Sequence, residues 1–463
     1  MLFSSATFIY LFLPAVLICH FAAPKAWKNG VLLFFSALFY FFGERAYTVL
    51  LVISSVSDYL HSLFIESRRG TRAARIALVS SIAVNLLLLG FFKYADFFVA
   101  TASALTGAKL PLPGIRLPIG ISFYTFQTMS YTIDVYRGAA RAERNLATFA
   151  TYVCLFPQLI AGPIVRYTDV AKELKERRVA LSDAAAGARR FAFGLGKKVL
   201  LANAFGELCG AFLNSGQKST LFYWVYVLAY TLQIYFDFSG YSDMAIGLGK
   251  LFGFRFPENF DYPFISRSIA EFWRRWHMTL GTWFKDYVYI PMGGNRVSAA
   301  KWLRNILAVW LLTGLWHGAS WNYVLWGLYF GVLLALEKLV LKKALDRAPA
   351  AVRHAYVLMC VLVSFAIFSA DDAGGLIPML SGLFGRAGLP LYTFETGYCL
   401  RSFGVLLAIG AIGSTPLFKK LWARVKTAKA ALILEPLSVA ALMAFCTAAL
   451  IDGSFNPFLY FRF

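Results

Sequence analysis

The sequence predicts an all-α integral membrane protein that crosses the bilayer many times. Of its 463 residues, 59% are hydrophobic and 15% are charged, whereas soluble domains are about 25% charged. The mean hydropathy of +0.62 agrees with this composition. Hydrophobic blocks of about 17–25 residues, the length that spans a bilayer as a helix, recur along the whole sequence.

These blocks predict a helical bundle with roughly 11–14 hydrophobic helices plus shorter re-entrant or interfacial helices, in a single domain over residues 1–463. The first block, 7–19, lacks a basic start and a small-residue cleavage site, so we expect a retained helix. Residues 221–238 and 240–252 are expected to form two separate segments.

Three hydrophilic stretches interrupt the apolar blocks. Residues 111–118 are a Pro/Gly connector that cannot be helical throughout. Residues 163–190 alternate acidic and basic side chains at helical spacing, which predicts a solvated or interfacial helix. Residues 253–305 carry eight basic residues among Phe, Trp and Tyr, and are too polar to span. We expect this third stretch to lie in the headgroup region or to fold into a cavity.

The net charge of +21 reflects basic loops between apolar blocks. Residues 68–75, 172–178 and 419–429 are examples, and short loops of this kind lie on the cytoplasmic side. Counting back from the first loop places the N-terminus outside the cytoplasm. Membrane lipids, not nucleic acid, are therefore the expected partners of this charge. The six cysteines show no metal-ligand or redox spacing, so no metal site is expected.

Two histidines stand in unusual contexts. His277 ends the basic aromatic block Glu271-Phe-Trp-Arg-Arg-Trp-His277, and His317 lies in the apolar run Leu315-Trp-His317-Gly-Ala-Ser-Trp-Asn322. An imidazole is costly to bury in a membrane segment and can transfer a proton near neutral pH. The structural alternatives are a core His317 bonded to Ser320 or a carbonyl, and a His277 on a lipid-facing basic helix. Gly314, one turn before His317, and Gly318, directly after it, leave room for a ligand or another backbone.

A polar stripe marks the segment Gln233-Ile-Tyr-Phe-Asp237-Phe-Ser-Gly-Tyr241. Gln233, Asp237 and Tyr241 follow one another at intervals of four, so they share one face of a helix. Such a stripe must face protein or water. It fits a structural hydrogen-bond network, the lining of a substrate tunnel, or proton coupling in a transporter.

Several ordered motifs together resemble the membrane-bound O-acyltransferase family, and within it the bacterial alginate O-acetyltransferase branch. That family pairs an Asn or His with an essential His about 40 residues later, as His277 and His317 are spaced here. The resemblance covers essentially the whole chain. The motifs are Leu117-Pro-Ile-Gly-Ile-Ser-Phe-Tyr-Thr-Phe-Gln127, Phe156-Pro-Gln-Leu-Ile-Ala-Gly-Pro-Ile-Val-Arg166, Tyr235-Phe-Asp-Phe-Ser-Gly-Tyr-Ser-Asp243, Phe272-Trp-Arg-Arg-Trp-His277, Tyr289-Ile-Pro-Met-Gly-Gly-Asn-Arg296 and Asn456-Pro-Phe-Leu-Tyr-Phe-Arg-Phe463.

The resemblance implies a bundle thinned at its centre, with a tunnel from a cytoplasmic cleft to an outer one. It implies acetyl-CoA as the acetyl donor, no bound cofactor, and His317 as general base with His277 positioning donor or acceptor. Arg274 and Arg275 are the candidate contacts of the donor phosphates. The remaining candidates to line the donor site or tunnel are Trp276, Asp237, Tyr241, Gln233, Asn259, Asn322 and Ser320.

The same resemblance implies a partner outside the bacterial cytoplasmic membrane. This would be an SGNH, esterase-like acetyltransferase that passes the acetyl group to a polysaccharide. Two alternatives stay open at this point. One is a D-alanyl or other acyl transferase of the same family, and the other is a membrane transporter or export channel.

Overall fold

The computed structural model describes residues 2–370, 372–425, 431–453 and 458–459, and over these residues it consists of helices and connecting segments without a strand. This confirms the predicted all-α class. Contacts between residues group the described chain into two compact units. Unit 1 comprises residues 2–192 and Tyr241–Glu258, and unit 2 comprises Phe193–Gly240 and Asn259–Leu459. The single domain over 1–463 stays a prediction.

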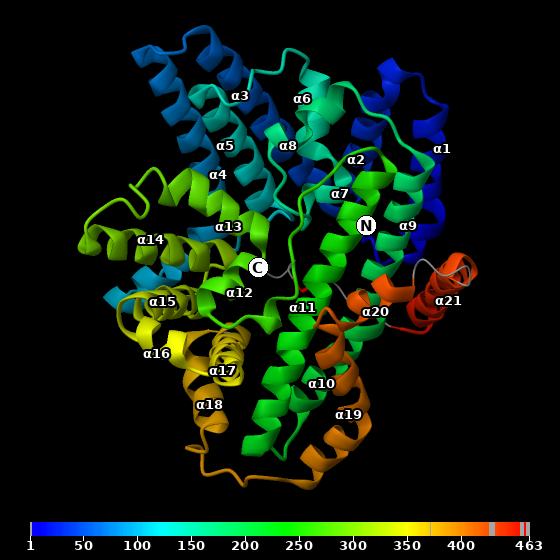
Figure 1. Cartoon of the computed structure of the whole chain (residues 1–463). Coiled ribbons are helices and arrows are strands. Elements are labelled where there is room, and N and C mark those ends of the chain that lie inside the picture. The colour runs from blue at the N-terminus through cyan, green and yellow to red at the C-terminus, as the bar shows by residue number, and fades with distance from the viewer. Residues whose placement is uncertain (1, 371, 426–430, 454–457, 460–463) are drawn as a thin grey trace. The chain divides into compact units, whose positions relative to one another are not determined.

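Unit 1 is built from the N-terminal helices, which Figure 1 draws in blue to green. Its elements are η1 (Phe8–Phe12), α1 (Leu13–Ala22), η2 (Lys25–Trp27), α2 (Lys28–Glu44), η3 (Arg45–Tyr47), α3 (Thr48–Ser67), α4 (Arg72–Thr106), α5 (Ile121–Arg137), α6 (Leu146–Cys154), α7 (Phe156–Leu159), α8 (Tyr167–Lys175) and most of α9 (Leu181–Gly196).

A buried polar network joins α3, α4 and α5 inside unit 1. Asp58 on α3 is fully buried and accepts hydrogen bonds from the Ser81 hydroxyl and the Asn85 amide of α4, both at 2.7 Å. The Asn85 carbonyl in turn accepts from Thr128 on α5 at 3.2 Å. Polar side chains within apolar helices are satisfied in this way by neighbouring helices, which fixes how the helices pack.

Unit 2 holds the remaining helices, including the long α11, whose last residues belong to unit 1. Its elements are η4 (Lys197–Ala202), α10 (Asn203–Asn214), α11 (Thr220–Leu251), η5 (Pro263–Ile265), α12 (Ile269–Arg275), α13 (Met278–Phe284), η6 (Lys285–Tyr289), α14 (Ala299–His317), α15 (Trp321–Leu336), η7 (Glu337–Leu341), α16 (Lys342–Arg347), α17 (Ala350–Ser369), α18 (Ala373–Leu383), α19 (Phe394–Gly413), α20 (Leu417–Val425) and α21 (Ala431–Asp452).

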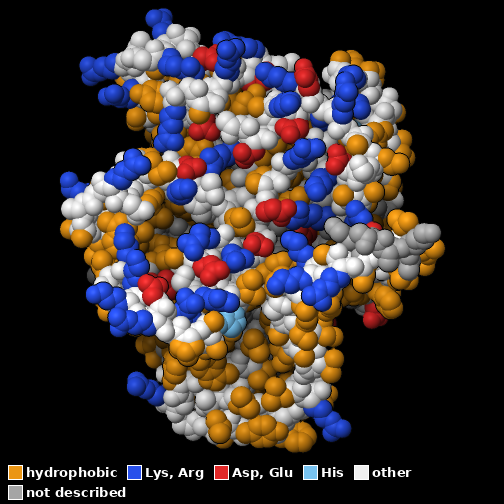
Figure 2. Space-filling view, in the orientation of Figure 1, with side chains coloured by type: hydrophobic (Ala, Val, Ile, Leu, Met, Phe, Trp, Pro, Cys, Tyr) orange, Lys and Arg blue, Asp and Glu red, His pale blue; other side chains and the backbone are white. Residues whose placement is uncertain are grey.

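Six helical stretches of the described chain are long and apolar enough to cross a membrane. Large hydrophobic side chains remain exposed along them, as expected for surfaces that face lipid. Figure 2 shows such side chains over α18 and α19. The chain is therefore a polytopic membrane protein. The six stretches are Lys25–Ser67, Arg72–Thr106, Trp321–Arg347, Ala350–Ser369, Phe394–Gly413 and Ala431–Asp452.

Two expected boundaries are wrong. The segments 221–238 and 240–252 form one helix, α11. Gly240 does not break this helix but lets the Gly194 backbone approach it closely, since a Cβ on Gly240 would lie 2.7 Å from the Gly194 carbonyl oxygen. Residues 163–190 form two helices, α8 and α9, separated at 176–180. The 111–118 connector is non-helical, as predicted.

The basic aromatic stretch 253–305 folds into short elements. The helices α12 and α13 have seven residues each, or about 10 Å at 1.5 Å per residue, far less than a bilayer requires. The first turn of α12 is fixed by Glu337 of η7, whose carboxylate accepts from the backbone N–H groups of Ile269 at 2.6 Å and Ala270 at 3.2 Å. The start of α12 is thereby anchored to η7.

Candidate functional site

His277 occupies the corner between α12 and α13. Its backbone is left-handed, with φ 44° and ψ 52°, a conformation that costs a non-glycine residue about 1–2 kcal/mol. Such strain persists only where the surroundings fix it, and it is common at functional sites. The corner is held by two backbone hydrogen bonds. The Met278 N–H donates to the Asn259 carbonyl at 3.0 Å, and the Asp261 N–H donates to the Arg275 carbonyl at 3.0 Å.

The tautomer of His277 follows from its contact with Asn259. The Asn259 Oδ1 atom accepts from the Thr279 backbone N–H at 3.3 Å and the Thr279 hydroxyl at 2.9 Å, so this atom is the amide oxygen. The same oxygen lies 3.1 Å from His277 Nδ1, which must therefore carry the proton. The lone pair of the neutral ring is then on Nε2, the nitrogen that can accept a proton or a hydrogen bond.

Burial keeps His277 neutral. The side chain is only 1% exposed, and desolvation lowers the pKa of His277 from 6.5 to about 3. The ring packs edge-on against Phe238 of α11, with centroids 4.7 Å apart. The alternative of a lipid-facing His277 is therefore wrong: the basic block folds inward at this residue.

His317 is the last residue of α14 and lies among aromatic rings. It is 2% exposed, and its ring centroid lies 4.9 Å from Trp326, 5.1 Å from Trp316 and 5.7 Å from Phe368. These rings come from α14, α15 and α17, so three helices fix the orientation of the imidazole.

Two glycines bring the backbones of α14 and α15 into contact just before His317. A Cβ on Gly314 would lie 2.3 Å from the Tyr323 carbonyl oxygen, and one on Gly327 would lie 2.2 Å from the Trp310 carbonyl oxygen. Only glycine permits this approach. This confirms one of the two uses predicted for the glycine beside His317, the approach of another backbone.

A single indole connects the two histidines. The Trp316 ring centroid lies 5.8 Å from His277 and 5.1 Å from His317. Residues 40 positions apart in the sequence therefore contact the same side chain. The structure thus brings together the two histidines that the sequence singled out.

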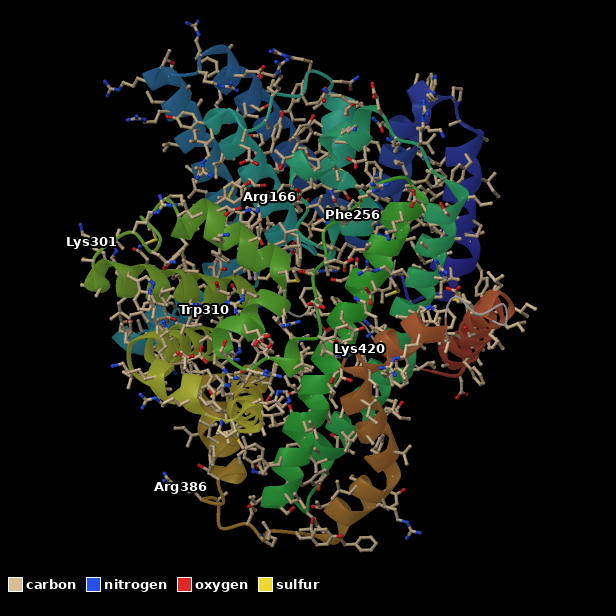
Figure 3. The ribbon with its side chains drawn as sticks, viewed as in Figure 1. Arg166, Phe256, Lys301, Trp310, Arg386 and Lys420 are labelled. Carbon is tan, nitrogen blue, oxygen red and sulfur yellow. The ribbon has the colours of Figure 1, made fainter. Side chains whose placement is uncertain are left out.

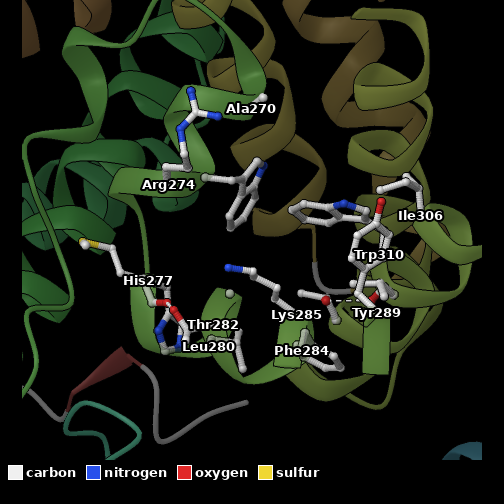
Figure 4. Close-up of a pocket in the computed structure, with 15 residues that line it drawn as sticks. Ala270, Arg274, His277, Leu280, Thr282, Phe284, Lys285, Tyr289, Ile306 and Trp310 are labelled. Atoms are coloured by element: carbon white, nitrogen blue, oxygen red, sulfur yellow. Dashed lines mark hydrogen bonds between the residues drawn. The ribbon is translucent and has the colours of Figure 1, made fainter. Parts of the chain in front are cut away.

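A cavity of about 360 Å³ opens beside His277 (Figure 4). Its apolar walls include the rings of Trp273, Trp310 and Tyr289, and its cations are Arg274 and Lys285. In Figure 4 the Lys285 amine extends toward the middle of the cavity. Pockets of this size, mainly apolar with a few polar groups, are typical of ligand sites.

His317 does not line this cavity but lies behind its aromatic wall. Trp273 contacts Trp310 at 4.5 Å, Trp310 contacts Trp326 at 6.4 Å, and Trp326 contacts His317 at 4.9 Å between ring centroids. Figure 3 labels Trp310, which projects from α14. A ligand in the cavity therefore meets His277 directly, whereas indole rings lie between the cavity and His317.

The two neighbouring arginines have different surroundings. Arg275 donates to Asp261 at 2.9 Å and to Glu271 at 3.1 Å, so its charge is already compensated. Arg274 lines the cavity and, like Lys285, forms no ion pair with any residue that the structure describes. Arg274 is thus placed to meet an anionic ligand. Lys285 was not singled out from the sequence, although its position in the basic aromatic stretch was the available signal.

The remaining candidates of unit 2 lie outside the cavity lining. Trp276 is buried in an aromatic cluster and stacks on Phe272 at 5.6 Å. The Asn322 amide donates to the Ala370 carbonyl at 2.8 Å, and Ser320 precedes the first turn of α15. These contacts tie the start of α15 to the chain after α17 and support the wall around His317.

The polar stripe of α11, formed by Gln233, Asp237 and Tyr241, lies away from the cavity lining. Asp237 forms a buried ion pair with Lys198 at 2.6 Å and accepts from the Leu459 N–H at 2.8 Å. Gln233 is buried one turn earlier, and Tyr241 belongs to unit 1, where it stacks on Phe3 at 4.7 Å. None of the three lines the cavity. Of the terminal motif 456–463, all but residues 458–459 lies outside the described residues.

Comparison with known proteins places this site in a recognised context. A family model described as MBOAT, membrane-bound O-acyltransferase family, matches residues 136–368, which contain both histidines and every residue of the cavity. A probable alginate O-acetylase AlgI of Azotobacter vinelandii is 41% identical over 389 residues, covering 83% of this chain and 78% of the relative.

Two further relatives are named for other activities. A peptidoglycan O-acetyltransferase of Helicobacter pylori is 32% identical over 427 residues, covering 84% of this chain and 81% of the relative. A teichoic acid D-alanyltransferase of Bacillus subtilis is 30% identical over 230 residues, covering 47% of this chain and 58% of the relative.

Proposed function

This chain belongs to the membrane-bound O-acyltransferase family, and from that premise we propose that it transfers an acetyl group from acetyl-CoA for the O-acetylation of a polysaccharide outside the membrane. It is an acyltransferase, so a transporter as its primary class is set aside. The observation that carries the proposal is the contact of His277 and His317 with one indole, beside a cavity whose two cations, Arg274 and Lys285, form no ion pair with a described residue.

The cavity supports a phosphorylated thioester as donor. Arg274 and Lys285 offer charge to phosphate oxygens, and Trp273 and Trp310 offer flat apolar surface to an adenine ring or to the thioester arm. Acetyl-CoA has these three parts. Arg275, paired with Asp261 and Glu271, contributes to the fold of the block in this proposal and not to the donor site.

His317 is the proposed general base. Its neutral imidazole would take the proton from the acceptor hydroxyl as the oxygen attacks the carbonyl carbon of the thioester. The carbon–sulfur bond then breaks, and the coenzyme A thiolate takes up the proton held by the imidazolium. A positioned base contributes roughly 10²–10⁴ in rate, and the dry aromatic cage excludes competing water.

His277 is proposed to position the reactants. Asn259 fixes the proton on Nδ1, so Nε2 can accept a hydrogen bond from an N–H or O–H group of the acetyl donor in the cavity, while the proton of the acceptor hydroxyl goes to His317. Because burial keeps the ring neutral, this role is available throughout the physiological pH range.

The relatives support the proposed acceptor and location. Relatives named for alginate and for peptidoglycan support a polysaccharide as the final acceptor. Both polymers lie outside the cytoplasm, whereas acetyl-CoA is cytoplasmic. We therefore place the protein in the bacterial cytoplasmic membrane, with an SGNH, esterase-like partner that receives the acetyl group outside.

The test is donor cleavage by the purified full-length protein. With acetyl-CoA alone we expect slow release of free thiol, and we expect His317→Gln to abolish it. The partial likeness to a teichoic acid D-alanyltransferase supplies the alternative donor, a D-alanyl thioester carrier. Cleavage of that carrier without cleavage of acetyl-CoA would overturn the acetyl proposal and retain the acyltransferase.

A further inference from the structure

A second cavity lies in unit 1, between the helices α3 and α4, which run side by side (Figure 1). It is an open groove of about 630 Å³. Both helices belong to stretches long and apolar enough to cross the membrane, and the apolar groove residues Leu60, Phe64 and Ile76 are 57%, 46% and 60% exposed. The groove therefore opens toward lipid, and its size is that of a ligand site.

The polar groups in the groove already have partners. His61 Nδ1 lies 2.8 Å from the Ser57 carbonyl oxygen, and His61 Nε2 lies 3.3 Å from the Ser80 hydroxyl. Because these contacts occupy both ring nitrogens, the interior of the groove does not require water or an ion. Its contents should be hydrocarbon.

One end of the groove is strongly basic. Arg68 follows Phe64 by one helical turn at the end of α3, and Arg72 precedes Ile76 by one turn at the start of α4. Both arginines are exposed and form no ion pair with any described residue. Figure 2 shows basic side chains gathered over this end of the two helices. The N-terminus of the 35-residue α4 adds the positive end of its dipole.

An apolar channel between two membrane helices that ends at uncompensated cations matches the chemistry of an anionic phospholipid. We propose that the α3–α4 groove binds one anionic glycerophospholipid of the surrounding bilayer. An acyl chain lies along Leu60, Phe64 and Ile76, and the headgroup phosphate pairs with Arg68 and Arg72. A zwitterionic lipid has the same acyl chains but a headgroup without net negative charge, so it binds more weakly.

A second basic pair in the chain provides a matched control for general attraction of anionic lipid to exposed basic side chains. On α20, Lys420 and Arg424 are also exposed, one turn apart, in the connection between the candidate spans α19 and α21 (Figure 3 labels Lys420). Neither residue lines the α3–α4 groove or the cavity beside His277. Removing this pair changes the net charge as much as removing Arg68 and Arg72 does.

The test is lipid retention by the full-length protein in mild detergent, measured by native mass spectrometry and thermal unfolding. Phosphatidylglycerol and phosphatidylcholine with the same acyl chains are titrated against the wild type, Arg68→Gln/Arg72→Gln, Ala77→Phe and Lys420→Gln/Arg424→Gln. Ala77 lines the groove, and the larger ring fills it. Ala73→Phe, at an exposed groove position, is the second filling variant should Ala77→Phe not fold.

We expect one phosphatidylglycerol to be retained by the wild type and to raise its midpoint temperature. The Arg68→Gln/Arg72→Gln protein should bind it on the order of tenfold more weakly. A filled groove should lose both lipids, and the α20 control should keep wild-type binding. Equal retention by wild type and the arginine variant, or an equal loss in the α20 control, would overturn the proposal.

Discussion

His277 and His317 are buried to the same degree, but different kinds of surroundings hold them. His277 is fixed by hydrogen bonding: Asn259 and a left-handed backbone determine which nitrogen carries the proton. His317 is fixed by packing, with aromatic rings from three helices around it. Hydrogen bonding specifies a tautomer, whereas packing specifies an orientation and excludes water.

Access differs as well. His277 lines the cavity together with Arg274 and Lys285, while His317 lies behind Trp310 and Trp326. This difference indicates a division of work in which donor binding is close to His277 and proton transfer is at His317. Variants near His277 and at His317 should therefore affect donor binding and proton transfer differently.

The largest effect is expected from His317. His317→Ala should lower polymer acetylation by roughly 10²–10⁴, because it removes the proposed base. Protein abundance in the membrane should stay near wild type. Acetylation is measured in cells and donor cleavage with purified protein, and the matched control is His354→Ala, a half-buried histidine whose ring contacts the Ser266 carbonyl. Near-normal acetylation by a well-expressed His317→Ala protein would remove His317 from the mechanism.

A smaller effect is expected at the other histidine. Asn259→Ala should lower kcat by about 10- to 100-fold, because His277 loses the partner that fixes its tautomer. Asn259→Asp keeps an acceptor at Nδ1 and adds a negative charge, so it should retain more activity and raise the pKa of His277. The measurement is the pH profile of kcat for both variants. Identical profiles and identical kcat would mean that Asn259 supports only the fold.

Much of this arrangement could be predicted from the sequence, because membrane burial makes polar residues conspicuous. The all-α class followed from hydropathy, folding into a cavity was one of the two placements expected for 253–305, and the family resemblance singled out His277 and His317 as a functional pair. Helix ends were harder. Gly240 looked like a break between segments, but it lies within α11 where two backbones meet, and a local pattern does not contain that distant contact.

The distinction between Arg274 and Arg275 also lay beyond the sequence. Adjacent residues on a helix point about 100° apart, so one can face a cavity while the other faces acidic neighbours. Asp261, which pairs with Arg275, comes from a turn 14 residues earlier. Lys285 was missed for the same reason, since only the folded corner brings η6 to the side of His277.

The two arginines provide the third test. Arg274→Ala and Lys285→Ala should each raise the KM for the donor by about tenfold with little change in kcat, because phosphate contacts persist from ground state to transition state. Arg275→Ala should leave KM near wild type and lower the thermal stability, since Asp261 and Glu271 lose their partner. A raised KM in Arg275→Ala alone would move the donor site away from the cavity.

The smallest expected effect concerns protons on His277. Its pKa is about 3 in the folded protein because of burial, against an ordinary value of 6.5. Between these values the unfolded chain binds the extra proton and the folded protein does not. Stability due to the neutral ring is therefore complete above pH 6.5 and declines as the pH falls toward 3. His277→Gln removes this titration, so its midpoint temperature in detergent should fall less between pH 6.5 and 4 than that of the wild type. The His354→Gln protein should follow the wild type. If His277→Gln loses as much stability as the wild type over that interval, the surroundings do not keep the imidazole neutral. The fixed Nε2 acceptor, by which His277 was distinguished from His317, would then have no support.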